Sequence, residues 1–168
     1  MTSADVIRRL HAHRLWTRAR ILVAARACTD AELRRTFEMG VGSPFATLVH
    51  LWGAEMVWAN VLEEADPAFM IPGAEAFPDL AALEDAWKPL DVRWTALLAR
   101  ADDPAFLARP IGRVRDGKRY VTSAHDVFLH VCTHQHYHAA QLSNMLRQMG
   151  RSLGPTDLIV MAREQWRD

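Results

Sequence analysis

The sequence predicts an all-α protein: an antiparallel four-helix bundle with a short C-terminal helix and a small extended hairpin before the fourth long helix. Apolar residues recur at helical spacing over four long stretches, which is the first observation behind this prediction. The second is that Ser, Thr or Asp stands before most of these stretches, and Gly or Pro breaks separate them. The third is composition: with 168 residues, of which 50% are hydrophobic, the chain can form one domain, residues 1–168, around a hydrophobic core.

The first long helix is expected over residues 3–26. Thr2 or Ser3 can act as its N-cap, because a hydroxyl oxygen there accepts a hydrogen bond from a free N–H group of the first turn. A second capping sequence, at Thr29, predicts a short helical turn after this helix. Several arginines fall on the first helix and are interpreted as a solvated face: Arg8, Arg9, Arg14, Arg18 and Arg20.

The second long helix is expected over residues 44–64. It begins with Ser43 as its cap and Pro44 at the first helical position, where proline is tolerated because the N–H that it lacks would have no helical partner. The helix should end before Pro67. A loop that contains Pro and Gly follows over residues 70–78.

The third long helix is expected over residues 79–101, where leucines and tryptophans form an apolar stripe. Pro89 lies inside this pattern and should kink the helix or divide it, because proline removes a helical hydrogen bond. An Asp-Asp-Pro sequence that begins at Asp102 ends the helix.

A short non-helical region is expected over residues 107–121. It contains Gly112, and an Asp116–Gly117 pair separates two short apolar segments. Asp-Gly is a preferred sequence for a tight turn between paired strands. The region therefore predicts a small hairpin or two extended stretches.

The fourth long helix is expected over residues 123–150, which contain no Gly or Pro before Gly150. Gly150 suits a helix C-terminus, because glycine adopts the left-handed conformation found there. A capping sequence at Thr156 then predicts a short final helix over residues 156–166.

Composition argues against several classes of function. Lys plus Arg equals Asp plus Glu, so the net charge is zero, and the basic excess of a nucleic-acid-binding protein is missing. No apolar run is long enough to span a membrane, and we expect no membrane partner. The N-terminus has no signal-peptide pattern, and Cys28 and Cys132 suggest no disulfide framework, so a cytoplasmic location is expected. Cys132 is interpreted as a small buried apolar residue.

The histidines are the strongest functional signal, since five of the eight fall within the fourteen residues 125–138. At about 100° per residue, His134 and His138 lie about 40° apart on one helix face, where two imidazoles can hold one metal ion. His125 and His136 point to the other side of the helix. His130, one turn before His134, is a rival ligand.

A third ligand is needed, because a catalytic zinc ion usually has three protein ligands and one open position. His50 lies on a stripe of small apolar residues in the second long helix, and it is expected to face the interior of the bundle. The fourth helix has apolar residues on both sides of the His134 and His138 stripe. The three histidines can share a metal or can be separate core residues, each hydrogen-bonded to a neighbour.

Several segments match one known family: HLWGAE at 50–55 with Trp58, HVCTHQHYHAAQ at 130–141, LRQMG at 146–150, and GPTDLI at 154–159 with Arg163 and Glu164. With these segments the chain resembles the DinB-like (damage-inducible, YfiT-type) family of four-helix bundles, which includes metal-dependent hydrolases and thiol-dependent transferases. The segments extend over almost the whole chain in the family's order. Ala139 and Ala140 depart from the family's pattern, where Arg-Gly is frequent, so a positive charge near the site is missing.

The resemblance implies that His50, His134 and His138 are the metal ligands and that His130 lies outside the coordination shell. It implies a divalent metal cofactor, with zinc favoured over nickel or iron, and a homodimer. It also implies a small-molecule substrate, with a low-molecular-weight thiol such as bacillithiol, mycothiol or glutathione as one candidate.

The function predicted from these residues is that of a metal-dependent hydrolase or a small-thiol-dependent transferase. The alternative is a non-catalytic, metal-binding stress-response protein in which the ion ties two helices together. Three further side chains are candidates for a role near the metal. Glu55 is interpreted as a surface carboxylate. Gln141 can hydrogen-bond a bound water or orient a ligand, or it can be an amide on the helix surface or between helices. His130 can support the site or belong to the core. The tryptophans Trp52, Trp58, Trp87 and Trp94 are interpreted as packing residues.

Overall fold

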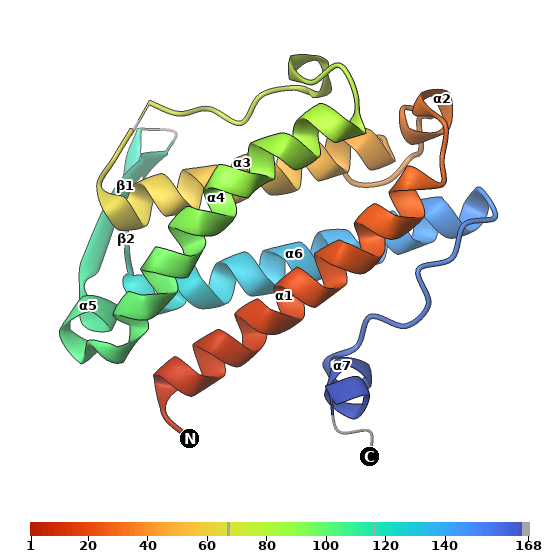
Figure 1. Cartoon of the computed structure of the whole chain (residues 1–168). Helices are drawn as coiled ribbons and strands as arrows, with labels where there is room; N and C mark the ends of the chain where they lie inside the picture. The colour runs from red at the N-terminus through yellow and green to blue at the C-terminus, as the bar shows by residue number, and fades with distance from the viewer. Residues whose placement is uncertain (67, 116, 166–168) are drawn as a thin grey trace.

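The structure, a computed structural model, describes residues 1–66, 68–115 and 117–165 (Figure 1). Most of the described chain is helical, and a two-stranded antiparallel sheet is inserted before the longest helix. The elements follow in the order α1 (Ser3–Arg26), α2 (Asp30–Leu33), α3 (Pro44–Glu63), α4 (Leu80–Ala99), α5 (Pro104–Ala108), β1 (Pro110–Arg115), β2 (Lys118–Ser123), α6 (Ala124–Gln148) and α7 (Leu158–Gln165). Two short 3-10 turns, η1 (Ala74–Ala76) and η2 (Arg100–Asp102), adjoin α4 on either side. A mostly helical protein with a small hairpin is therefore confirmed.

The long helices begin at the capping residues that the sequence indicates. Thr2, rather than Ser3, caps α1: its side chain accepts a hydrogen bond from the backbone N–H of Asp5. Ser43 caps α3 and Ser123 caps α6 in the same way. These bonds satisfy N–H groups that have no partner within the helix, which is why the helix starts could be predicted to within a residue.

The helices α1, α3, α4 and α6 surround a common core. Helix α6 packs against both α1 and α3, α3 also contacts α4, and α1 contacts α4 (Figure 1). Fully buried side chains from all four helices fill the space between them, including Ile21, Leu48, Trp94 and Leu142. The hairpin follows α5 and leads directly into α6, and α7 lies against α1. No helix in the described part of the chain is both long enough and apolar enough to cross a membrane.

Helix α4 runs without a break through Pro89. Of the two predicted effects, a kink or a division of the helix, the division is therefore wrong. A proline inside a helix removes one N–H donor, and the hydrogen bonds on either side of it can hold the helix together. The buried stripe of α4, which includes Leu83, Trp87, Leu90 and Trp94, continues past the proline on both sides.

The region before α6 forms a hairpin, which was one of its two predicted forms. Ile111 pairs with Thr122, and Arg113 pairs with Tyr120. Gly117 has a φ of 72°, a left-handed conformation that glycine adopts without strain. Three residues at predicted boundaries lie outside the described residues: Asp116 of the turn, Pro67 after the second long helix, and Trp166 at the end of the last.

Helix α5 was not predicted, because the Asp-Asp-Pro sequence was interpreted only as a helix end. In the structure, Asp103 accepts a hydrogen bond from the backbone N–H of Ala105, and Pro104 occupies the first helical position. Asp followed by Pro is a helix-start signal, so the same sequence is compatible with the end of one helix and the start of the next.

Candidate metal centre

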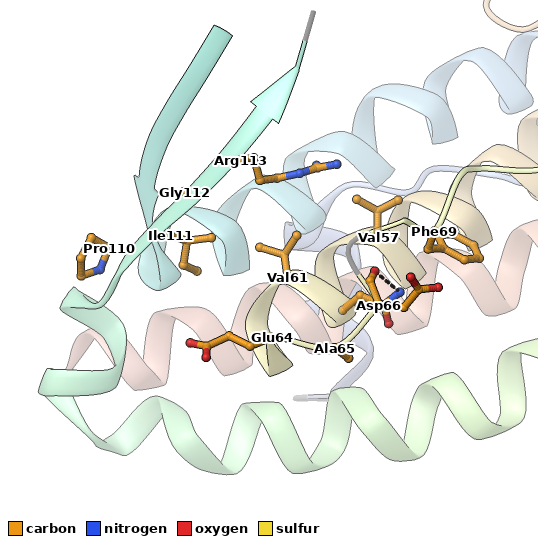
Figure 2. Close-up of a pocket in the computed structure, with 11 residues that line it drawn as sticks. Val57, Val61, Glu64, Ala65, Asp66, Phe69, Pro110, Ile111, Gly112 and Arg113 are labelled. Atoms are coloured by element: carbon orange, nitrogen blue, oxygen red, sulfur yellow. Dashed lines mark hydrogen bonds between the residues drawn. The ribbon is translucent and has the colours of Figure 1, made fainter. Parts of the chain in front are cut away.

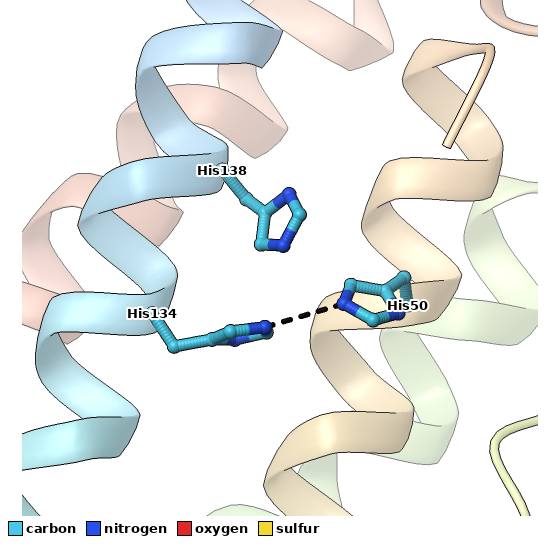
Figure 3. A group of neighbouring side chains, drawn as sticks. All are labelled: His50, His134 and His138. Atoms are coloured by element: carbon cyan, nitrogen blue, oxygen red, sulfur yellow. Dashed lines mark hydrogen bonds between the residues drawn. The ribbon is translucent and has the colours of Figure 1, made fainter. Parts of the chain in front are cut away.

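Three histidine side chains converge between α3 and α6. His50 comes from α3, and His134 and His138 come from successive turns of α6 (Figure 3). One ligand atom from each ring lies within 4.8 Å of the others, and the Nε2 atoms of His50 and His134 are 3.2 Å apart. The expectation that these three side chains come together is therefore confirmed.

The packing of the two helices places this cluster near the surface. On α6, Val131 and Leu142 flank the histidine stripe and are buried, as the sequence predicted. His138 is only 6% exposed, whereas His50 and His134 are half-buried. His50 faces α6, as expected, but its ring is only half-buried. Two of the three rings are therefore partly exposed to solvent.

The environment keeps the three imidazoles neutral. Burial lowers the pKa of His134 to about 4, and the neighbouring His138, His50 and His130 add to the effect. Burial, and then the proximity of His138, lowers the pKa of His50. Burial also lowers the pKa of His138, against the opposing effect of its hydrogen bond to Gln141. Neutral imidazole is the form that donates an electron pair to a metal, so the cluster has the right protonation state near pH 7.

Gln141 orients one of the three rings. The Nδ1–H group of His138 donates a hydrogen bond to Oε1 of Gln141 at 2.8 Å, which leaves Nε2 of His138 with its lone pair free for a ligand bond. Of the two roles weighed for Gln141, the structure shows the contact that an orienting residue needs. A hydrogen bond on the outer nitrogen is typical of metal-binding histidines.

Gly40 makes room for Gln141 and was not recognised from the sequence. Its φ is 57°, and a Cβ atom at this position would collide with the side-chain amide of Gln141. The only available signal was the Gly-Val-Gly-Ser-Pro sequence before α3, which marks a turn but does not reveal which side chain approaches it.

The remaining α6 histidines lie outside the cluster. His130 is exposed, and its ring contacts Trp58 and His134, with centroid distances of 4.9 Å and 5.5 Å. His136 faces His13 on α1. His125 is half-exposed in the first turn of α6. Cys132 is buried, and burial raises the pKa of its thiol to about 12, so it is a poor source of thiolate.

Glu55 is not a surface carboxylate, contrary to the prediction. It is 2% exposed, and its Oε2 atom lies 2.6 Å from Nη1 of Arg14 and 3.4 Å from Nη1 of Arg18. Trp87 also donates a hydrogen bond from its Nε1–H group to this oxygen. The prediction of a solvated arginine face is wrong at the same place, because Arg14 and Arg18 are 2% and 8% exposed. Glu55 neutralises buried arginines, since an ionised group inside a protein needs a partner of opposite charge.

One pair of nitrogen atoms in the cluster has the spacing of two ligands of a single metal ion. Two nitrogen ligands of a tetrahedral zinc ion, each about 2.0–2.1 Å from it, lie about 3.3 Å from one another. The separation of 3.2 Å between the His50 and His134 nitrogens agrees with that value. Imidazole ligands suit zinc, nickel and iron alike, so the set of donors fits each of the metals considered.

The protein is mostly helical, and two of its helices bring three neutral imidazoles together. These features are those of a candidate metalloprotein. The model of the DinB family matches residues 1–168, and the chain belongs to this family. A search of curated proteins found no match.

Proposed function

We propose that the protein is a metal-dependent enzyme, either a hydrolase or a small-thiol-dependent transferase, with His50, His134 and His138 as the ligands of one divalent ion. The observation that carries this proposal is the convergence of three neutral imidazoles within 4.8 Å at a half-buried place between α3 and α6. Zinc is the favoured metal, and nickel or iron can occupy the same donors.

The donor set favours a reactive site over a structural one. Within the described residues, the metal-binding group consists of these three side chains, whereas structural zinc sites usually have four protein ligands. A divalent ion held there would lower the pKa of a coordinated water or thiol, so that a nucleophile is available at neutral pH. The chain contributes three neutral donors, the hydrogen bond from His138 to Gln141, and an approach for a substrate past the half-buried His50 and His134 rings.

The two proposed reactions differ in the nucleophile. In hydrolysis, water adds to an electrophilic carbon, the bond to the leaving group breaks, and the protons of the water end on the two products. In thiol transfer, a new S–C bond forms, and the leaving group departs with the proton of the thiol. Both reactions need one small-molecule site beside the ion, so the cluster supports both equally.

The alternative is a non-catalytic stress-response protein in which the ion only links α3 to α6. It requires a fourth protein ligand or a site closed to solvent. A structure with bound metal would distinguish the two proposals: water on the ion supports the enzyme, and four protein side chains without water support the structural role.

The overall assembly belongs to the same proposal. We infer that α1, α3, α4 and α6 form an antiparallel four-helix bundle of the DinB type and that two chains form a homodimer. The dimer rests on the family resemblance, because Trp87 and Trp94 are buried in the core and cannot contribute to an interface. Light scattering at micromolar concentration should give twice the mass of the chain, and a monomer mass would refute the dimer.

The activity is tested with protein that has been stripped of metal and reloaded with zinc, nickel or iron. Bacillithiol, mycothiol and glutathione are each offered with chlorodinitrobenzene as the electrophile, and para-nitrophenyl acetate tests hydrolysis. We expect turnover that appears only on reloading, disappears in His138→Ala and persists in His136→Ala. Equal turnover in stripped and reloaded protein would contradict a metal-dependent enzyme.

A further inference from the structure

A cavity of about 640 Å³ lies between the hairpin, α3 and α6, close to the histidine cluster. Its volume falls within the range of about 300–1,000 Å³ that is common for small-molecule sites. Trp58 from α3 and His130 from α6 line it, and the hairpin lines the opposite side. Neither the three-histidine cluster nor its proposed chemistry accounts for this cavity.

The register of the hairpin determines which side chains face the cavity. Side chains that are opposite one another on paired strands lie on the same face of a sheet, and the next pair along lies on the other face. Arg113 pairs with Tyr120, and Ile111 pairs with Thr122, so these four share one face. All four line the cavity. Gly112 and its partner Val121 lie on the opposite face, where the side chain of Arg119 approaches Gly112.

The walls of the cavity are aromatic and apolar. The indole of Trp58 is half-buried, His130 is exposed, and Tyr120 is 54% exposed. Ile111 and Val127 are buried and provide an apolar surface beneath these three rings. Exposed aromatic rings around a hollow contribute little to the core, but they can cover the faces of a flat ligand.

Arg113 marks the polar side of the cavity. The guanidinium of Arg113 lies over the ring of Trp58, 5.0 Å from its centroid. A guanidinium has five N–H donors and binds carboxylates and similar anions in two-point contacts. Figure 2 shows Arg113 extending from β1 on the side of the hairpin that faces the helices.

The carboxylate of Asp126, which also borders the cavity, is already engaged by other donors. Its Oδ2 accepts hydrogen bonds from the backbone N–H of Ser123 at 3.2 Å, from the Ser123 hydroxyl at 2.7 Å and from the Thr122 hydroxyl at 3.2 Å. It also lies at the N-terminus of α6, where the helix dipole favours a negative charge. Oδ2 of Asp126 is therefore directed toward Ser123 and Thr122, whereas the guanidinium of Arg113 lies over Trp58.

His130 connects this cavity to the proposed metal site. Its ring contacts Trp58 on the cavity side and His134 on the other. His130 and His134 are one helical turn apart on α6, a rise of about 6 Å. A ligand of ordinary metabolite size in the cavity can therefore reach the histidine cluster with one end.

A second cavity, of about 600 Å³, lies beside the C-terminal end of α3 (Figure 2). It shares Ile111 and Arg113 with the first, but it also contains the carboxylates of Glu64 and Asp66. It is lined neither by His130 nor by any of the three clustered histidines. The first cavity is therefore the better match for a molecule that reacts at the cluster.

We propose that the cavity formed by Trp58, Tyr120, His130 and Arg113 binds the organic part of the substrate, and that this part is a flat apolar group carrying a carboxylate or sulfonate next to Arg113. The reactive end of the molecule points past His130 toward the three histidines. This assignment rests on the proposed function, since it adds a substrate class to the same site.

The probe is anilinonaphthalene sulfonate, a flat aromatic anion whose fluorescence rises on binding, and phenylnaphthylamine serves as its uncharged counterpart. Both are titrated into zinc-loaded protein, and the zinc content of every variant is measured alongside. We expect saturable binding of both probes, and about tenfold weaker binding of the anion to Arg113→Gln, as the loss of one charge-assisted contact implies. The uncharged probe should bind Arg113→Gln and wild type equally.

The opposite face of the hairpin supplies matched controls. Arg119→Gln removes a cation and Val121→Ala trims an apolar side chain there, and both variants should bind the probes as wild type does. Tyr120→Ala, which alters an exposed residue and should fold normally, should weaken binding of both probes. A wild-type protein that holds zinc but binds no anion, or an equal loss in Arg113→Gln and Arg119→Gln, would overturn the cavity assignment and leave the metal site standing. Binding that depends on Arg113, in a protein that takes up none of zinc, nickel and iron, would support the cavity as an anion site and refute the metal-dependent function.

Discussion

Gln141 joins the histidine cluster to the loop that precedes α3. It accepts the hydrogen bond from Nδ1 of His138, and Gly40 leaves the space that its amide occupies. The amide therefore determines both the tautomer and the direction of the His138 ring. The hydrogen bond between His138 and Gln141 therefore leads to a prediction about the affinity of the site for zinc.

Replacing Gln141 with Leu should lower the affinity for zinc by about 10–100-fold, because His138 loses the acceptor that orients it. Gln148→Leu, near the exposed end of the same helix, should leave the affinity unchanged. Competition with a chromophoric chelator measures both variants. An unchanged affinity in Gln141→Leu would show that the hydrogen bond does not support the site.

Residues on one helix face were the most predictable part of the site. His134 and His138 could be paired from their spacing alone, because four residues make about one turn. His50 lies 84 residues before His134. Its apolar stripe made it a candidate third ligand, and the resemblance to a family favoured a shared metal over separate core histidines. Glu55 was misjudged because its burial depends on Arg14 and Arg18 from another helix, a contact that no local pattern reveals.

The helices α1, α3 and α4 are linked by a buried charge cluster. Arg14 and Arg18 of α1 meet Glu55 of α3, and Arg18 also contacts Asp91 of α4 at 2.5 Å. The guanidinium groups of Arg14 and Arg18 also lie over the rings of Trp94 and Trp87. Through Glu55, this cluster ties α3, the helix that carries His50, to α1.

Removal of the central carboxylate should therefore destabilise the fold strongly. Glu55→Ala leaves the buried Arg14 without its carboxylate partner and Arg18 with Asp91 alone, and breaking a buried ion pair costs about 3–5 kcal/mol. Asp85→Ala removes a pair with Lys88 in which both side chains are at least 70% exposed, and such pairs contribute about 0–1 kcal/mol. Denaturant unfolding measures the two losses. Equal and small losses of unfolding free energy in the two variants would show that the cluster does not stabilise the helix packing. The zinc content of the folded protein should be the same in both variants.

Helix boundaries could be predicted well, and helix packing could not. The caps Thr2, Ser43 and Ser123 act on N–H groups within a few residues, so the sequence contains the whole interaction. Helix α5 was missed because one Asp-Pro pair can end one helix and begin another. The contacts that bring α3 against α6 depend on side chains far apart in the chain, and only the structure places them.

At the scale of the whole molecule, burial of titratable groups makes the fold sensitive to acid. His11 is 1% exposed in the core, where its Nε2–H group donates a hydrogen bond to the carbonyl oxygen of Phe128. Burial, and then the charge of Arg14, lowers its pKa to about 3. In the unfolded chain its pKa is about 6.5, so protonation favours the unfolded state at any pH below that value.

The stability that neutral His11 provides is therefore complete above about pH 6.5 and decreases as the pH falls toward 3. Between pH 6.5 and 5 this single group should account for about 2 kcal/mol of the loss. In His11→Gln that part of the pH dependence should disappear, whereas His125→Gln, half-exposed on α6, should behave as wild type. Unfolding of metal-free protein in denaturant at pH 7 and pH 5 gives the comparison. An equal loss in wild type and His11→Gln would refute the assignment of the effect to His11.

The central claim is that His50, His134 and His138 together hold one divalent ion, and elemental analysis of untagged protein tests it most directly. Wild type, His125→Ala and His136→Ala should each contain about one ion per chain, because the ligands are intact in all three. Replacing His50, His134 or His138 with Ala should remove most of the metal, because two imidazoles bind an ion much more weakly than three. Equal metal content in wild type and His138→Ala would contradict the claim.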